Sequence, residues 1–455
     1  MLTEIRAANF KLFGDPGLRL SLAPLTILLG PNGSGKTSAL DALGLLAQSA
    51  PMPNTGGGQG IKWQGRWVDF SSDGIYASFQ RDVEKPMSLG FSLLGGSAFA
   101  KWQTDAEVFP VKQIEGKSFG YLLVYGRKPN LWIHQLSIDE RVVAQNEVNR
   151  VISADGMSAG FQTSLKMHIS SGLVAAQPAE NGPAVLRDRL FTPVFQQHPL
   201  SPENKAAEEL AGMMRVVLLY MSDYLRSKVF MVGSGREPRD SQPELPPGAL
   251  SVGRHGEYTL PLLSVLFSRP EYRSQAARIR EWASRFSLEN LTAGWSGEPT
   301  LAAGYNDPTT STPLRLGDAG FGSQQLLPVI TQLFCAPPGS VIVIEEPEMS
   351  LHPEAQIAVM KMFFDAVRGG QQVIFTTHSP TLLSALSEAA KEIPLNHDDV
   401  AIYHFSREQD RPTVQRLPLD KRWYIPNWIP SFSRVESRLL KDWINNIHDE
   451  LKKEG

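Results

Sequence analysis

The sequence predicts an α/β fold in which segments from both ends of the chain build one parallel sheet. Near the N-terminus, the apolar run LTILLG (25–30) is typical of a buried strand, and the helical pattern SALDALGLLAQ follows it. After residue 313, helical and strand patterns alternate, which favours a parallel sheet covered by helices. Between about 60 and 155, short strands separated by turn residues indicate an antiparallel sheet.

The composition is that of an ordinary globular protein. The chain has 455 residues, of which 42% are hydrophobic and 20% charged, and its net charge is −3. This charge gives no global positive field, so DNA binding is possible but is not indicated. The single cysteine, Cys335, excludes an intrachain disulfide and fits a reducing compartment. With no signal-peptide pattern and no apolar run long enough to span a bilayer, we expect a cytoplasmic protein without a membrane segment.

The stretch GPNGSGKTS fits the phosphate-loop pattern G-x-x-x-x-G-K-[ST]. Small residues let backbone N–H groups turn toward a β-phosphate, Lys36 reaches the β and γ oxygens, and the Thr37 hydroxyl binds Mg²⁺. A plain Gly-rich turn is the alternative, but the strand before it and the helix after it supply the context that the pattern requires. The predicted ATP-binding residues of this loop are Gly30, Asn32, Gly33, Ser34, Gly35, Lys36, Thr37 and Ser38.

A second motif, VIVIEE at 341–346, places adjacent carboxylates at the end of a buried strand. Mg²⁺ would compensate their negative charge: Glu345 would assist the metal, and Glu346 would be the general base or orient the attacking water. Asp is the usual residue at the first position, and the longer Glu favours metal contact through a water. Glu348 is expected to be structural or to support the other acids. A strand end with solvated acids is the alternative.

The stretch VIFTTHSP repeats this design, because a strand ends in Thr376, Thr377 and His378. A histidine at a strand end beside a phosphate loop can contact a γ-phosphate and sense its hydrolysis. A histidine without a special role is the alternative. We assign His378 a catalytic role together with Glu346 and Lys36.

The segment GDAGFGSQQLLPVI (317–330) predicts a second anion site. Gly320, Gly322 and Ser323 precede a helix expected from about Gln324, and helix N-termini attract anions. Because the chain already has a phosphate loop, Gly322 and Ser323 are expected to serve the γ-phosphate bound to another copy. A simple helix cap by Ser323 is the alternative.

These motifs, in the order phosphate loop, GFGSQ, IEEPEMSLHP and TTHS, resemble the ABC-type ATPases of the SMC/OLD branch. More narrowly, they are similar to the OLD-like, AAA-labelled ATPases of bacterial anti-phage defence, such as the ATPase subunits of Septu- and PARIS-type systems. The stretch ANFKLFGD also matches, and FMVGSGREPR…VGRHGE (230–257) resembles the GP-x-R segment of this group. The resemblance is weak from about 90 to 225.

The resemblance implies an ABC-type P-loop ATPase head with an antiparallel β subsheet and a helical insertion. Residues 1–155 would form the N-terminal half of the head, 156–300 a mixed, largely helical insertion, and 301–455 the C-terminal half with its tail. It also implies a head-to-tail dimer, or a higher oligomer, in which ATP lies between the phosphate loop of one copy and Gly322–Ser323 of the other.

The resemblance assigns further residues. Phe10, Lys11 and Phe13 match the segment that lies near the adenine, and Gln80 matches the Q-loop glutamine, which would contact the metal with Thr37 and Glu345. Residues 350–353 occupy the position of the D-loop, at the dimer seam. Two departures matter: the chain has no coiled-coil arms, and too few residues follow His378 for a Toprim nuclease module.

Three other stretches carry weaker signals. Arg236 and Arg239 are expected to serve the inter-subunit or nucleotide site. The arginine-rich helix at 271–286 is expected to be a solvated charged face rather than a phosphate site. The tail DKRWYIPNWIPSF (420–432), with its aromatic side chains Trp423, Tyr424 and Trp428, either seals the core or docks a partner.

The favoured hypothesis is a Mg²⁺-dependent ATPase whose ATP-held dimer changes shape on hydrolysis and gates a separately encoded effector, a nuclease or toxin, in anti-phage defence. The defence role rests on the resemblance alone. One alternative is a nucleotide-held scaffold that turns over slowly and sequesters a partner. Another is a DNA-repair type of ATPase that binds DNA directly and shows salt-sensitive binding.

Overall fold

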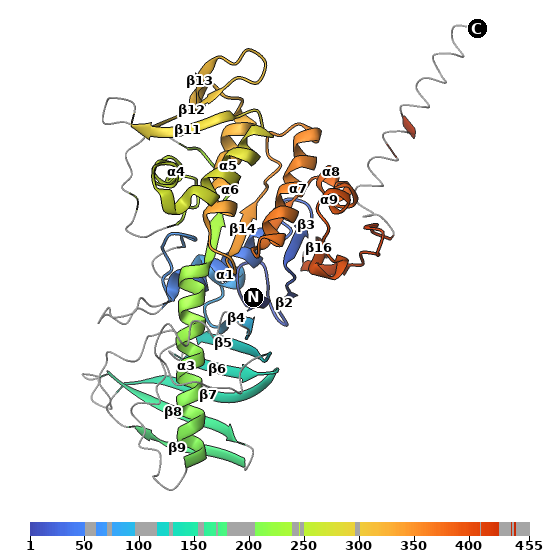
Figure 1. Ribbon diagram of the computed structural model, residues 1–455. Helices are drawn as coiled ribbons and strands as arrows, with labels where there is room; N and C mark the ends of the chain where they lie inside the picture. Colours follow the sequence, from blue (N-terminus) through green and yellow to red (C-terminus); the bar gives the residue numbers. More distant parts are fainter. Residues whose placement is uncertain are drawn as a thin grey trace.

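A computed structural model describes most of the chain and contains a six-stranded, an eight-stranded and a three-stranded sheet within the described residues (Figure 1). The described residues are 1–50, 61–70, 75–95, 116–126, 131–152, 159–169, 172–179, 205–238, 245, 250–295, 301–409, 411–426, 438 and 441–442.

The core sheet joins strands from both ends of the chain, as the sequence predicts. Its order is β10-β14-β15-β3-β16-β17, and all neighbours are parallel except β16 and β17. The register pairs Glu345 with Thr376 and Thr377 with Leu29, so the carboxyl ends of β14, β15 and β3 meet at one edge. The strands are β3 (Leu25–Leu29), β10 (Val229–Val232), β14 (Val341–Glu345), β15 (Gln372–Thr377), β16 (Val400–Glu408) and β17 (Arg411–Leu417).

Both faces of this sheet are buried, which explains its unbroken apolar runs. In β14, Val341 and Val343 face one hydrophobic cluster, and Ile342 and Ile344 face the other. The first cluster contains α1 (Lys36–Ser49) and the C-terminal part of α3 (Lys205–Lys228). The second contains the other described helices: α4 (Thr259–Ser268), α5 (Arg273–Ser284), α6 (Phe321–Cys335), α7 (Pro353–Arg368), α8 (Pro380–Ser384) and α9 (Leu386–Glu392).

The eight-stranded antiparallel sheet packs on α1 through the apolar side chains of its first strands. Its order is β2-β1-β4-β5-β6-β7-β8-β9, and Figure 1 shows α3 running alongside it toward β10. The strands are β1 (Leu2–Ala8), β2 (Leu18–Ser21), β4 (Met87–Leu94), β5 (Ser118–Gly126), β6 (Leu131–Ile138), β7 (Arg141–Ile152), β8 (Ala159–Ile169) and β9 (Gly172–Ala179).

The small third sheet lies at the other end of the molecule, against α4 and α5 (Figure 1). It contains β11 (Glu289–Trp295), β12 (Leu301–Asn306) and β13 (Pro313–Arg315), and it leads directly into α6. Short 3-10 turns complete the described elements: η1 (Ile75–Ala77), η2 (Phe79–Arg81), η5 (Pro270–Tyr272), η6 (Leu316–Asp318) and η7 (His397–Asp399). None of the described helices combines the length and the apolar character needed to cross a membrane.

The predicted α/β class, with an antiparallel sheet beside the core sheet, is confirmed. The division at 155 and 300 stays a prediction, and secondary structure continues across the first boundary. Strands β8 and β9 extend the antiparallel sheet to Ala179, while β10 belongs to the core sheet. The antiparallel sheet therefore extends beyond the predicted 60–155 in both directions. Strands β8 and β9 extend it toward the C-terminus, and β1 and β2 from the start of the chain also pair with it.

The buried ring of Trp282 ties α5 to the second cluster. It is 1% exposed, stacks on Phe334 at 6.2 Å between ring centroids, and donates from Nε1 to Asp365 Oδ2 at 2.8 Å. We expect Trp282→Ala to lower the free energy of unfolding by about 3–5 kcal/mol, because it leaves a cavity and removes one of the hydrogen bonds that Asp365 accepts. Trp295→Ala is the matched control, since that ring is 65% exposed. Equal melting temperatures for the two variants would contradict the packing described.

Candidate active site

The phosphate loop connects the end of β3 to the start of α1. Its conformation requires glycine at Gly30 (φ 151°) and Gly35 (φ 110°). A Cβ on Gly30 would lie 2.1 Å from the carbonyl oxygen of Phe405, and one on Gly35 would lie 3.1 Å from the Phe13 ring. Asn32, Gly33 and Thr37 are exposed, whereas Ser34 and Ser38 are buried and the hydroxyl of Ser34 has no hydrogen-bond partner. The predicted loop is therefore formed, with the Thr37 side chain accessible.

Lys36 folds back on its own loop. Its Nζ donates to the carbonyl oxygens of Gly30 (2.7 Å) and Pro31 (3.0 Å) and lies 3.3 Å from His378 Nε2. Burial lowers the pKa of Lys36, and the nearby charges of Glu346 and Glu348 oppose that shift. A phosphate arriving at this loop would replace carbonyl oxygens as the acceptor of the ammonium protons.

Three residues predicted to be catalytic lie together. His378 Nε2 lies 3.0 Å from Glu346 Oε1 and 3.3 Å from Lys36 Nζ, although Lys36 and His378 are far apart in the sequence. Glu346 has φ 46°, and its N–H donates to the carbonyl and hydroxyl oxygens of Thr376. The roles of these residues stay predictions, but their convergence is what a γ-phosphate site needs.

Glu348 holds the backbone at His378 in place through hydrogen bonds. Its Oε1 accepts from the Thr377 hydroxyl (2.7 Å) and from the backbone N–H of His378 (2.8 Å). Its other oxygen, Oε2, is buried without a hydrogen-bond partner. The side chain thus connects the turn after β14 to the end of β15, which agrees with the structural role expected for it.

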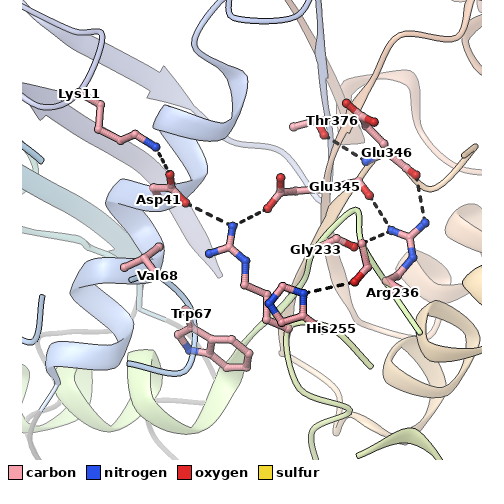
Figure 2. A network of polar contacts seen from close by, with 12 residues as sticks. Lys11, Asp41, Trp67, Val68, Gly233, Arg236, His255, Glu345, Glu346 and Thr376 are labelled. Carbon is pink, nitrogen blue, oxygen red and sulfur yellow. Dashed lines mark hydrogen bonds and ion pairs between the residues drawn. The ribbon is translucent and has the colours of Figure 1, made fainter. Parts of the chain in front are cut away.

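Arg236 differs from its prediction. Its side chain is completely buried and donates to the backbone carbonyl oxygens of Gly233, Gln325, Glu345 and Glu346, as Figure 2 shows in part. Burial lowers its pKa to about 10, and the three nearby glutamates oppose that shift. Because its N–H groups already donate to backbone oxygens inside the protein, this guanidinium does not reach a nucleotide or a second subunit. Arg239 lies outside the described residues.

A chain of charges connects the N-terminal loop to the end of β14 (Figure 2). Lys11 pairs with Asp41 Oδ2, and Arg254 Nη2 lies 3.7 Å from Asp41 Oδ1 and 3.0 Å from Glu345 Oε1. Desolvation raises the pKa of Glu345, and Arg254 opposes that shift. Sequence reasoning missed Arg254 and Asp41. The available signals were the VGRHGE stretch and the position of Asp41 one helical turn after Thr37.

The residues present fit a magnesium ion only together with a nucleotide. Within the described ranges, no group of three or more His, Cys, Asp or Glu side chains can hold a metal. Thr37 and Glu345 supply a hydroxyl and a carboxylate, and Mg²⁺ commonly takes few protein ligands plus phosphate oxygens and waters. Gln80, the third predicted ligand, is exposed on η2 with φ 53°, and its metal role stays a prediction.

The segment predicted to lie near the adenine contributes mainly to the core. Phe10 is 0% and Phe13 3% exposed, and the Phe10 ring meets Phe70 edge-on at 5.9 Å. Phe10 also pairs with Ser78, which attaches the η1–η2 turn and Gln80 to this segment. The Phe13 ring lies against Gly35 of the phosphate loop. Because both rings are buried in this conformation, their contact with an adenine base stays a prediction. Lys11 is half-buried on Asp41.

The predicted second anion site begins earlier than expected. Helix α6 starts at Phe321, and Ser323 is inside the helix, where its hydroxyl donates to the carbonyl oxygen of Phe286. Ser323 is therefore not the helix cap, which removes that alternative. A Cβ on Gly322 would lie 2.6 Å from the carbonyl oxygen of Ser350, so this segment touches the predicted D-loop. Phe321 is 57% exposed beside it.

The tail and the arginine-rich helix have structural roles in the described part. Trp423 packs on Phe364 at 5.3 Å and Ile425 is buried, so the start of the tail covers the core. Tyr424 is exposed, and Trp428 lies outside the described residues. Four arginines of α5 and its flanks contact carboxylates or rings of the same chain: Arg269, Arg278, Arg280 and Arg285.

Comparison with known proteins agrees with this geometry. A protein-family model described as "AAA domain, putative AbiEii toxin, Type IV TA system" matches residues 25–87 and 181–384, more than half of the chain. The chain belongs to this family. The matched ranges of this AAA-domain ATPase include the phosphate loop, the acid pair, His378, Arg236 and Arg254.

More distant likenesses are short or weak. An OLD nuclease of Thermus scotoductus is 32% identical over 78 residues, which are 17% of this chain and 15% of that protein, so the chain spans a small part of that relative. The SMC head domain of Thermotoga maritima has 10% identity and a TM-score of 0.37, with 92% and 99% of the chains covered. An Smc head bound to ScpA from Pyrococcus furiosus has 11% identity and a TM-score of 0.43, with 91% and 96% covered. TM-scores this low do not establish a common fold.

Arg236 can be tested as a buried support of the acid pair. We expect Arg236→Met to lower the free energy of unfolding by about 3 kcal/mol or more, because it leaves several buried carbonyl oxygens without donors. The measurement is chemical denaturation followed by fluorescence. Arg269→Met is the control, since its partner Glu271 and the arginine itself are both exposed. A loss no larger than that of the control would show that the buried hydrogen bonds are dispensable.

Proposed function

We propose that this chain is a Mg²⁺-dependent ATPase that dimerises around ATP and gates a separately encoded effector. The observation that supports hydrolysis most directly is the convergence of Lys36, Glu346 and His378 at one edge of the core sheet. A cation, a carboxylate and an imidazole at the carboxyl end of parallel strands form a suitable environment for phosphoryl transfer to water.

The chain's own residues divide the task. The backbone N–H groups of the phosphate loop and Lys36 bind the phosphates and balance the negative charge that develops on them. Glu346 accepts a hydrogen bond from the attacking water and withdraws its proton, while His378 orients the Glu346 carboxylate and contacts the γ-phosphate. When bound, Mg²⁺ would supply charge neutralisation at the phosphate oxygens, held by Thr37 and Glu345.

Dimerisation is supported by the contact between two predicted seam segments. Gly322 at the start of α6 lies against Ser350, so both segments belong to one surface. Phe321 is exposed there, and the N-terminal end of α6 carries a partial positive charge that favours a phosphate. A second copy that presents its nucleotide to this surface would close both sites by symmetry.

Effector gating is the most specific part of the proposal. It draws on the family description, which names a toxin of type IV toxin–antitoxin systems, and on the local similarity to an OLD nuclease. Closing and opening of an ATP-held dimer would expose or cover a surface for a nuclease or toxin encoded separately. Anti-phage defence is the setting that we propose for this gating, in the cytoplasm.

The first test addresses the proposed general base. Glu346→Gln should reduce steady-state phosphate release by roughly 10²–10³-fold while ATP binding persists, because the amide cannot take a proton from water. Phosphate release is measured at saturating ATP, and binding by calorimetry. Glu388→Gln, which removes an exposed carboxylate paired with Lys361, is the control. An unchanged rate in Glu346→Gln would favour the slow scaffold over the enzyme.

The second test addresses the seam. Phe321→Asp places a negative charge at the first turn of α6, where it favours the helix but repels a phosphate of the other copy. In a Glu346→Gln background, we expect this variant to remain monomeric with ATP and Mg²⁺ in light-scattering chromatography. Tyr424→Asp is the control, because Tyr424 is also 57% exposed. ATP-dependent dimers of Phe321→Asp at wild-type strength would rule out this surface.

A further inference from the structure

Arg254 occupies the carboxylate that a divalent cation would need. Its Nη2 lies 3.0 Å from Glu345 Oε1, and the Glu345 side chain is 12% exposed. The same nitrogen lies 3.7 Å from Asp41 Oδ1. Because residues four apart on a helix share a face, Asp41 lies one turn from the Thr37 hydroxyl. A cation of the protein itself is therefore placed beside both predicted metal-binding groups.

Asp41 Oδ1 is a second possible acceptor for the Arg254 guanidinium. Asp41 Oδ1 is buried and has no hydrogen-bond partner, while Oδ2 of the same carboxylate pairs with Lys11. A buried polar atom without a hydrogen bond costs free energy, so moving the Arg254 N–H groups onto Oδ1 would recover part of it. Arg254 thus has two carboxylates within reach and hydrogen-bonds to only one of them.

The backbone around Arg254 is held in place, so such a shift would need only the side chain to move. The carbonyl oxygen of Arg254 accepts from Gly233 N at 2.7 Å, and Tyr258 N donates to the carbonyl oxygen of Val252 at 2.9 Å. The Arg254 side chain is 21% exposed, which leaves it room to rotate. Reorientation between Glu345 and Asp41 therefore requires no change in the sheet or in α1.

We propose that Arg254 is a built-in counter-cation that holds Glu345 in the metal-free protein and transfers to Asp41 when a divalent cation binds with nucleotide. This inference rests on the Mg²⁺-dependent function proposed above. Lys11, Asp41, Arg254 and Glu345 are two cations and two carboxylates, so the group is balanced without metal. A divalent cation at Glu345 repels the guanidinium, and Asp41 accepts it.

The consequence is that metal binding depends on nucleotide. A metal without phosphates must displace Arg254 from a partly buried ion pair and gains few ligands in return. A metal that arrives bound to a nucleotide already has phosphate oxygens as ligands, and these contacts offset the free energy of displacing Arg254. Arg254 thus keeps Glu345 paired, and the acid site closed to free cations, until the phosphate loop is loaded.

The test measures Mn²⁺ binding, so it does not depend on hydrolysis. Free Mn²⁺ is followed by electron paramagnetic resonance with saturating ADP, corrected for Mn²⁺ bound to ADP alone. In Arg254→Met we expect Mn²⁺ to bind about tenfold more tightly or better, because a competing charge is gone. Arg254→Lys should stay near wild type. Arg278→Met is the control, since Arg278 also pairs with an aspartate, Asp365, but in a different part of the protein.

A double-mutant cycle tests the second acceptor. Asp41→Asn should weaken Mn²⁺ binding about tenfold in wild type, because displaced Arg254 then has no negatively charged partner, and should have little effect when Arg254 is already Met. Unchanged or weaker Mn²⁺ binding in Arg254→Met overturns the inference, as does an equal effect of Asp41→Asn in both backgrounds. If wild-type ADP binding is insensitive to divalent cations, the proposed function itself fails.

A structure of the wild-type protein with ADP and Mn²⁺ decides the matter if Arg254→Met does not fold. Arg254 within hydrogen-bonding distance of Asp41 Oδ1 supports the transfer. Arg254 still on Glu345, with metal bound, overturns it.

Discussion

The candidate active site depends on carboxyl groups held at the end of a buried strand. Removing such groups from water costs on the order of several kcal/mol per ion unless cations and donors compensate. The protein supplies these from separate segments: Lys36 from the phosphate loop and Arg254 and Arg236 from the region after β10. That requirement explains why a stretch between the two sequence halves of the head takes part in the site.

The same compensation fixes the backbone of the acids. Glu346 has a left-handed conformation that costs a non-glycine residue roughly 1–3 kcal/mol, and such a conformation persists only where its surroundings determine it. Here the Thr376 oxygens accept its N–H, and Arg236 donates to its carbonyl oxygen. The carboxylate is thereby directed toward His378. A buried arginine thus helps to decide where the Glu346 carboxylate points.

The two large sheets meet at α1, which joins nucleotide binding to the rest of the molecule. One side of the helix packs with the antiparallel sheet in the first hydrophobic cluster, while its start carries Lys36 and Thr37 and its next turn carries Asp41. A change in the charges around Asp41 therefore acts on an element that both sheets contact.

The sequence by itself determined the α/β class, the phosphate loop, the acid pair and His378, because each is a local pattern of strand, turn and helix. It did not show that Phe10 is a core ring, that α6 begins at Phe321, or that Arg254 pairs with Glu345. Those features arise from contacts between segments far apart in the chain, where packing and burial select the partner. The sequence does not distinguish a solvated charged residue from a buried one. Only the tertiary structure excludes water around the side chain, and it thereby decides which carboxylate or carbonyl group forms its hydrogen bonds.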